Sequence, residues 1–140
     1  MAKIAPEVEI IHYSAPSFAA ADGLAVTADI LTANPELDAI FSEDDESSIG
    51  ALQAIADAGR TDIKAITGGG GCQAYFALIK ERTDVAASSA LYSPLMIKDC
   101  FDVALAVIKG EAFEPVVVIP STIVRAENVD EYIDPANTIY

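Results

Sequence analysis

The amino-acid sequence predicts an α/β fold: a mostly parallel open sheet with helices on both faces. Short apolar segments alternate with helical patterns of about 10 to 16 residues, the connections between them are short, and the apolar segments are nearly continuous, as in strands that are buried on both sides. The length of 140 residues suits one compact domain or part of a larger one.

Two strands and a helix are expected in the first third of the chain. Residues 8–13 form a β-branched segment that ends in a Ser-Ala-Pro loop. In the helix that follows, Ala and Leu residues recur at helical spacing, Ser17 is a candidate N-cap, and Asn34 followed by proline ends the pattern. Residues 38–41 then predict a short strand.

The middle of the chain continues the alternation. The segment SSIGALQAIADAG predicts a helix, because its apolar residues share one face and Gly59 stands where a left-handed residue commonly ends a helix. Residues 63–67 predict a third strand. A run of four glycines follows, then a helix over 72–82 and a fourth strand over 85–91.

The last third predicts one long helix and an extended segment. Ser93 and Pro94 suit the N-cap and first positions of a helix that ends at Gly110. Most of its circumference is apolar, so it requires burial. Residues 115–124 predict extended chain, and 127–133 a final turn.

Composition excludes several partners. Twenty-two acidic residues against eight basic ones give a net charge of −14, which repels phosphates and anionic lipids, so nucleic acids and membrane surfaces are poor partners. No apolar segment approaches the roughly 20 residues that span a bilayer. The first ten residues lack the parts of a secretory signal, so the chain is expected to be intracellular or to lack its natural N-terminus. The two cysteines are expected to be free thiols.

In open parallel sheets, ligands bind beyond the carboxyl ends of the strands. The acidic run 43–45 follows such an end and can hold a divalent metal through carboxylate oxygens, as in receiver domains or hydrolases. Alternatively, Asp45 or Glu46 stabilises the start of the next helix. A receiver domain also needs a lysine at a later strand end, and the sequence offers none there.

The glycine run lies between a strand and a helix. Gly69, Gly71 and Ala74 satisfy the GxGxxA pattern of a dinucleotide turn. That turn needs an acidic residue about 20 positions later, where residues 89–91 are Ser, Ala and Leu. Two interpretations stay open: the glycines let the chain turn sharply, or Gly69 and Gly70 let the backbone approach a neutral ligand.

No catalytic triad can be built from this sequence. The single histidine, His12, lies in a predicted strand and is expected to be solvated. Phe18 is different, because the small residues around it leave the ring prominent after a strand. An aromatic face beside carboxylates is a combination that recognises sugars, and Tyr92 offers a second such surface.

Three strings resemble the second half of periplasmic sugar-binding proteins of ABC importers, of the ribose-binding type. The most specific is NPELDAIFSEDDESSIGALQAIADAGRTDIKAITG, and YSPLMIKDCFDVALAVIKGE and VVVIPSTIVRAENVDEY resemble the closing helix and strand of that family. The resemblance extends over residues 8–134 and implies the second lobe of a periplasmic-binding-protein fold, in truncated form.

The resemblance also implies roles for particular residues. Phe18 stands where the family stacks a ring on the sugar, and Asp44 where an Asn contacts its hydroxyls. Asp45 matches the Asp that follows, as a helix cap. Gly69 replaces a hydroxyl-binding Asp, which alters selectivity, and Tyr92 lies near a polar pocket residue.

By the same resemblance, residues 1–91 are part of the C-terminal ligand-binding lobe, and residues 92–140 are a closing helix and tail that return to the N-terminal lobe. The implied function is non-catalytic: the recognition half of an extracytoplasmic receptor for a sugar or polyol, which needs no metal or cofactor and delivers to a membrane permease. Without the first lobe the long helix is uncovered, so we expect a homodimer. Two other functions stay open, an effector-binding domain of a lactose-repressor-like regulator and an NAD(P)-dependent oxidoreductase.

Overall fold

A computed structural model describes residues 5, 7–92 and 96–137 of the chain. Its elements, in chain order, are α1 (Ala20–Ala33), β1 (Ala39–Ile40), α2 (Asp45–Asp57), β2 (Ala65–Gly69), α3 (Gln73–Glu81), β3 (Ala86–Leu91), α4 (Ile97–Lys109), β4 (Thr122–Val124) and a short 3₁₀ helix, η2 (Val129–Glu131). The expected helices and the last three expected strands are present with small shifts at their ends. The proposed caps Ser93 and Pro94 lie outside the described residues.

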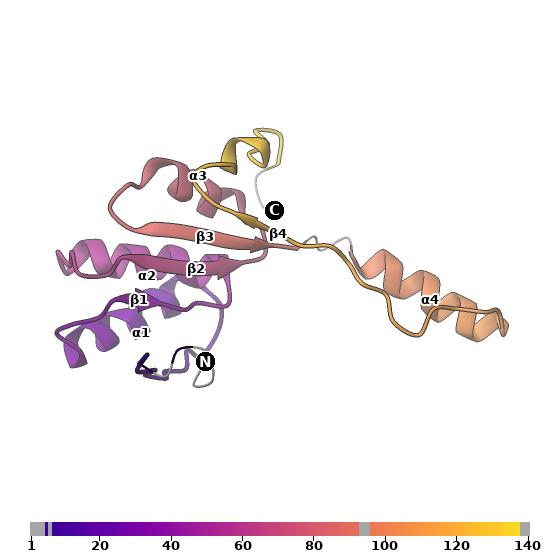
Figure 1. Cartoon of the computed structure of the whole chain (residues 1–140), viewed down its shortest axis with the longest axis horizontal. Coiled ribbons are helices and arrows are strands. Elements are labelled where there is room, and N and C mark those ends of the chain that lie inside the picture. The colour runs from indigo at the N-terminus through magenta and orange to yellow at the C-terminus, as the bar shows by residue number, and fades with distance from the viewer. Residues whose placement is uncertain (1–4, 6, 93–95, 138–140) are drawn as a thin grey trace.

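The four strands form one open sheet in the order β1-β2-β3-β4 (Figure 1). The first three strands are parallel, and β4 runs antiparallel to β3. Ala65 of β2 pairs with Ala39 on one side and Ala86 on the other, which aligns the carboxyl ends of the three parallel strands. The predicted class, a mostly parallel open sheet with helices, is confirmed.

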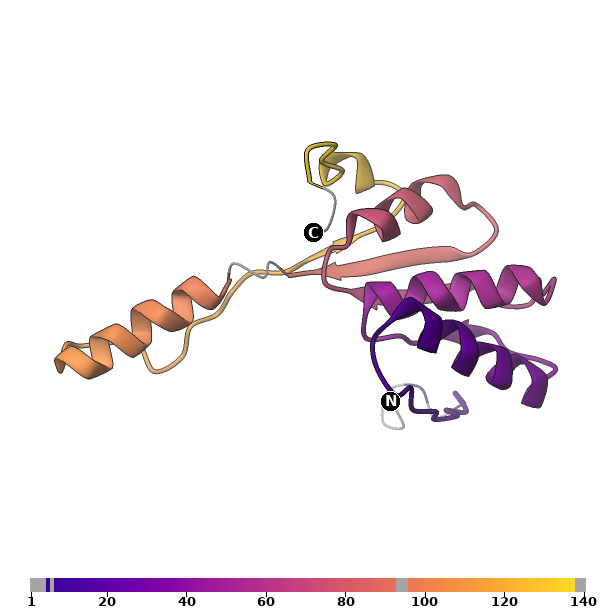
Figure 2. The ribbon, with the colours of Figure 1, turned by 180° about the vertical axis from the view of Figure 1, so that it is seen from behind.

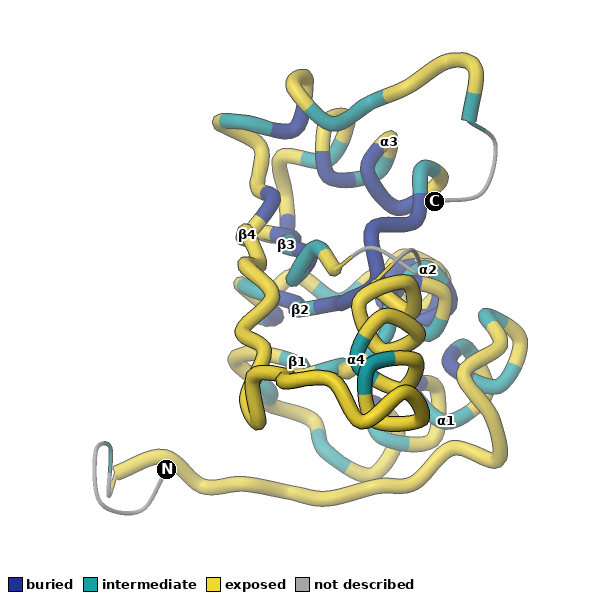
Figure 3. The backbone as a smooth tube through the Cα atoms, turned by 90° about the vertical axis from the view of Figure 1, so that its right-hand side faces the viewer, coloured by how far each residue is buried: buried dark blue, intermediate teal, exposed yellow. Residues whose placement is uncertain are grey.

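The expectation of helices on both faces is wrong for the described residues. Figure 3 shows α1, α2 and α3 on the same side of the row of strands. The connections from β1 to β2 and from β2 to β3 advance in the same direction across the sheet, and right-handed crossovers that advance the same way place their helices on the same face. The opposite face has no helix from the described part of the chain.

Helices α1 and α2 pack at very short range through two glycines. A Cβ on Gly50 would lie 1.9 Å from the carbonyl oxygen of Ala20, and a Cβ on Gly23 would lie 2.4 Å from that of Ser47. Side chains at either position would force the helices apart. The two glycines therefore set how closely α1 approaches α2.

The core lies between α2, α3 and the helix-facing side of the sheet. The tail joins it, because Val124 and Val129 are buried and the rings of Phe76 and Tyr132 meet edge to face, with centroids 6.5 Å apart. Large side chains that are fully buried each contribute roughly 1.5–3 kcal/mol. They are Leu52, Ile55, Ile63, Ile66, Tyr75, Phe76, Ile79, Val124 and Val129.

The junction between α1 and β1 is held by an arginine and an aspartate. Arg60 donates to both carboxylate oxygens of Asp62, at 2.7 and 2.6 Å, and also to the backbone carbonyls of Leu31 and Asn34. The guanidinium thus satisfies carbonyls at the end of α1, and it lowers the pKa of Asp62 well below its ordinary value. The predicted helix end at Asn34 is confirmed.

Residues 8–13 are extended but form no strand, so that prediction is wrong. Their side chains are exposed, and the structure records no ladder between them and β1, which is the edge strand of the sheet. A strand needs a partner for its backbone groups, and β-branched composition does not supply one. Ser17 is not the N-cap of α1 either: that position is Ala19, whose N–H donates to the Ser17 hydroxyl at 3.1 Å.

An arm extends from the carboxyl end of the sheet (Figures 1 and 2). We define the arm as residues 96–121, which are α4 and the segment that returns beside it to β4. No residue of α4 is buried. From Thr122 onward the chain packs on the same sheet and core as the residues before position 91. The proposed division into residues 1–91 and 92–140 stays a prediction.

No helix in the described part of the chain combines the length and apolar character needed to cross a bilayer.

Candidate functional site

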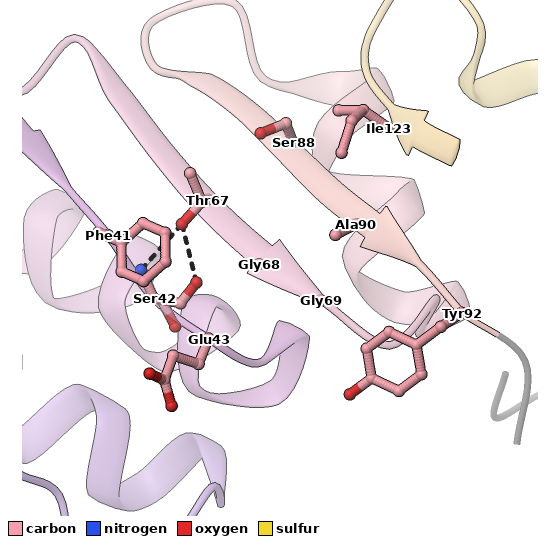
Figure 4. Close-up of a pocket in the computed structure, with 10 residues that line it drawn as sticks. All are labelled: Phe41, Ser42, Glu43, Thr67, Gly68, Gly69, Ser88, Ala90, Tyr92 and Ile123. Carbon is pink, nitrogen blue, oxygen red and sulfur yellow. Dashed lines mark hydrogen bonds between the residues drawn. The ribbon is translucent and has the colours of Figure 1, made fainter. Parts of the chain in front are cut away.

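A cleft of about 350 Å³ opens where the carboxyl ends of β1, β2 and β3 meet. Three chain segments line it in Figure 4: the residues after β1, the end of β2, and β3 with the residue after it, beside one residue of β4. The lining residues are Phe41, Ser42, Glu43, Thr67, Gly68, Gly69, Ser88, Ala90, Tyr92 and Ile123. The cleft therefore lies at the sheet edge where open parallel sheets bind ligands.

The loop after β1 is fastened to β2 at the cleft. The backbone N–H of Ser42 donates to the hydroxyl of Thr67 at 3.0 Å, and that hydroxyl donates to the Ser42 carbonyl at 2.8 Å (Figure 4). This pair substitutes for a further rung of the ladder. It holds Phe41 and Glu43, on either side of Ser42, at the wall of the cleft.

The helix cap in the acidic run is Asp44, so the expectation that Asp45 or Glu46 caps α2 is wrong. The Asp44 carboxylate accepts hydrogen bonds from the N–H groups of Glu46 and Ser47, at 2.8 and 3.2 Å. This is the common N-cap geometry, and it engages the carboxylate that we had assigned to ligand hydroxyls. Asp44 is not among the residues that line the cleft.

Asp45 is a buried carboxylate that joins the start of α2 to the glycine run and to strand β3. Its Oδ2 atom accepts hydrogen bonds of 2.8 Å from the N–H groups of Gly71 and Cys72 and from the Ser89 hydroxyl. Burial raises the pKa of Asp45, and the three hydrogen bonds oppose that shift. A signal for this role exists in the sequence, since Asp45 shares a helical face with Ser48 and the buried Leu52.

The glycine run leaves room for the Asp45 carboxylate and donates a hydrogen bond to it. A Cβ on Gly68 would lie 2.4 Å from the Oδ1 atom of Asp45 and 2.8 Å from the Tyr75 ring. Gly71 has a φ of 95°, which side chains rarely adopt. The sharp-turn interpretation thus accounts for these two positions. Gly69 lines the cleft, and the N–H of Gly70 donates to the carbonyl of Ala90 at 3.1 Å.

This arrangement disfavours a dinucleotide site. In a dinucleotide turn, the N–H groups at the start of the helix bind pyrophosphate. Here the N–H groups of Gly71 and Cys72, which precede α3, donate to Asp45. A carboxylate already fills the anion-binding position, and it would repel a phosphate.

The aromatic residues divide between the cleft and its surroundings. Phe41 and Tyr92 line the cleft, and Phe41 is 80% exposed. Phe18 is 63% exposed and lies just before α1, where its carbonyl accepts a hydrogen bond from Ser47; it does not line the cleft. The sequence prediction missed Phe41 because it counted this residue as the end of a strand. The described residues contain no cluster of His, Cys, Asp and Glu side chains suited to a metal ion.

The protein-family model described as "periplasmic binding protein domain" matches residues 1–112 of the sequence. The chain belongs to the periplasmic binding protein family. Its sequence is 30% identical over 135 residues to a protein of Rhizobium meliloti that is named as a candidate rhizopine-binding protein, covering 89% of this chain and 40% of that protein. It is also 41% identical over 44 residues to the ribose import binding protein of Escherichia coli, covering 31% and 15%. The ribose-binding type stays a prediction.

Solved structures of this family share the fold. An ABC transporter solute-binding protein from Agrobacterium vitis with bound allitol is 28% identical, with a TM-score of 0.76, and the match covers 92% of this chain and 47% of that one. A second, from Mycobacterium smegmatis with bound glycerol, is 22% identical with a TM-score of 0.83, covering 99% and 47%. This periplasmic binding protein chain thus spans less than half the length of these relatives.

Proposed function

We propose that this chain is the ligand-recognition half of an extracytoplasmic receptor that delivers a sugar or polyol to an ABC importer. The cleft at the carboxyl ends of β1, β2 and β3 is the observation that carries the proposal. Its lining combines aromatic rings, which cover the C–H face of a polyol, with hydroxyl, carboxylate and backbone groups, which pair with its hydroxyls.

The charge at the cleft favours a particular class of polyol. Glu43 is the charged residue among those that line the cleft, and the whole chain carries −14. A carboxylate accepts hydrogen bonds from hydroxyls but repels anions. We therefore assign neutral polyols and sugars to the cleft, ahead of sugar acids.

The residues proposed to contact the ligand fall into two groups. Tyr92 and Gly69 keep their proposed roles at the cleft, and Phe41 joins them as the ring nearest to β1. The proposed contacts of Phe18, Asp44 and Gly70 would need a ligand that extends past the cleft, toward α1 for the first two and toward the start of α3 for Gly70. Such a receptor binds reversibly, carries out no covalent chemistry, and docks on a permease outside the cytoplasm.

Calorimetric titration with allitol, ribose, glucose and glucuronate tests this function. We expect heat of binding with at least one neutral compound and weaker binding of glucuronate. Phe41→Ala should weaken binding about fivefold or more, because stacking on an aromatic ring contributes roughly 1 kcal/mol or more. Phe113→Ala, which removes a half-exposed ring of the arm, is the matched control and should leave affinity unchanged.

Phe18→Ala separates the two proposed ring platforms, since it removes a ring that lies outside the cleft. Binding that is lost in Phe18→Ala but kept in Phe41→Ala would move the site toward α1. Absence of heat with every neutral compound, together with binding of NAD, would overturn the proposal in favour of the oxidoreductase.

A further inference from the structure

One buried carboxylate lies next to all three segments that bring the parallel strands to the cleft. Asp45 follows the lining residue Glu43 by two positions. Its Oδ2 atom accepts a hydrogen bond of 2.8 Å from the N–H of Gly71, two positions after the lining residue Gly69. The same atom accepts one of 2.8 Å from the hydroxyl of Ser89, which lies between two lining residues of β3. One oxygen therefore connects the start of α2, the turn after β2 and strand β3.

Two further contacts at the cleft each join only two of these segments. The Ser42 and Thr67 pair fastens the loop after β1 to β2. The Gly70 N–H, which donates to the Ala90 carbonyl at 3.1 Å, fastens the turn after β2 to β3. Asp45 differs from both, because it reaches every segment at once.

The turn after β2 depends on this anchor, because glycines form it. Gly70 and Gly71 have φ angles of 122° and 95°, a region that side chains rarely adopt. Glycine has more backbone freedom than any other residue, so such a turn is ordered by the groups that its N–H groups bind. Those of Gly71 and Cys72 bind the Asp45 carboxylate. Without that carboxylate, the turn would lose its fixed position beside the cleft.

We propose that Asp45 is a positioning residue for ligand binding: its carboxylate holds the three cleft segments in the binding arrangement before the ligand arrives. This inference rests on the proposed function of the cleft. Asp45 is not among the residues that line the cleft, so it acts through those that do. A cleft with an ordered wall binds more tightly, because the entropy of ordering that wall is not lost when the ligand binds.

Asp62 provides a matched comparison, because it is a second carboxylate that holds backbone in place. It accepts a hydrogen bond of 2.9 Å from the Leu37 N–H and pairs with Arg60. It lies just before β2, at the amino end of that strand, whereas the cleft lies at the carboxyl end. Removing the Asp62 carboxylate therefore perturbs the scaffold without a direct link to the cleft.

Amide hydrogen exchange of the ligand-free chain tests the anchoring of the turn. In Asp45→Ala, the N–H groups of residues 70–72 should exchange about tenfold faster or more, relative to those of β2, because the acceptor that orders the turn is gone. In Asp62→Ala, the same ratio should stay at its wild-type value. Unchanged protection of the turn in Asp45→Ala would overturn the proposal, since the turn would then hold its position by itself.

Calorimetric titration with allitol, ribose and glucose tests the effect on binding, at a temperature where circular dichroism shows each variant to be folded. Asp45→Ala should raise the Kd of the compound that the wild type binds best by about tenfold or more, because ordering even one released residue costs that much. Asp62→Ala should leave this Kd unchanged, although it lowers stability. A merely structural role would give the two variants the same result.

Two milder variants complete the series. Asp45→Asn keeps a carbonyl oxygen for the three donors, and its amide nitrogen takes the place of Oδ1, which is buried and accepts no hydrogen bond from the described residues. It should therefore rescue binding to within about threefold of the wild type. Ser89→Ala removes only the link to β3 and should raise the Kd about threefold or more, so it carries the test if Asp45→Ala does not fold.

The outcomes separate this inference from the proposed function. A wild-type chain that binds none of the three compounds would overturn the proposed function, and the positioning role with it. A wild-type chain that binds, with the same Kd in Asp45→Ala or in a folded Ser89→Ala, would overturn the positioning role alone. Equal weakening by Asp45→Ala and Asp62→Ala would also overturn it, because Asp45 would then contribute only to overall stability.

Discussion

Replacing Asp45 by alanine removes the acceptor that the glycine run and strand β3 share. The N–H groups of Gly71 and Cys72 and the Ser89 hydroxyl would lose their partner, and Ser89 is fully buried. Each buried donor left without a partner costs about 1–3 kcal/mol, and water that enters the vacated volume recovers part of this. We expect Asp45→Ala to lower the free energy of unfolding by about 3–5 kcal/mol, a large share of the roughly 5–15 kcal/mol typical of a domain.

Two variants with smaller expected costs serve as references for this value. Asp45→Asn keeps a carbonyl oxygen for the three donors and removes the buried charge, so its cost should be about 1 kcal/mol. Asp44→Ala removes the helix cap and should cost about 1 kcal/mol as well. Urea unfolding followed by circular dichroism measures all three. Equal midpoints for Asp45→Ala and Asp44→Ala would refute the reasoning that the buried carboxylate holds the glycine turn.

The pH dependence of the Asp45 variants has a definite sign. Because burial raises the pKa of Asp45 in the folded state, its charged form is the unfavourable one there. The contribution of Asp45 to stability therefore grows as pH falls through its raised pKa toward the ordinary value of 3.8. Asp45→Asn should remove this gain, so the wild-type advantage should be larger in mild acid than at neutral pH.

Two further predictions concern the scaffold. Gly50→Ala should destabilise the chain by about 1–3 kcal/mol in urea unfolding, although alanine is the better helix former, because its Cβ would lie 1.9 Å from the Ala20 carbonyl. The exposed control Ala56→Gly reports the propensity effect alone, and a stabilised Gly50→Ala would contradict the close packing of α1 on α2. Since Arg60 lowers the pKa of Asp62, the contribution of that pair to stability is complete above the ordinary carboxyl pKa and shrinks as pH falls below it toward the lowered value. Asp62→Asn should thus lower the urea midpoint more at about pH 7 than near pH 2.

The sequence by itself determined the order and type of most elements. Each depends on a pattern within a few residues of the chain: helical apolar spacing, the stop at Asn34, and Gly59 with a φ of 61° after α2. The strand ends were also predicted, and with them the sheet edge where the cleft lies. Local conformational preference acts over these distances, so local patterns record it.

The tertiary structure decided which residues meet. Neighbouring carboxylates have similar local signals, and only the packing of α2 on the glycine turn makes Asp44 a cap and Asp45 a buried acceptor. The β-branched residues 8–13 are not a strand, because a strand exists through hydrogen bonds to a neighbour that composition does not specify. The placement of α2 and α3 on one face follows from strand order and crossover handedness, which are properties of the assembled sheet, and α1 joins that face by packing on α2. Side-chain burial, strand pairing and crossover handedness depend on segments that lie far apart in the chain, so local sequence patterns do not specify them.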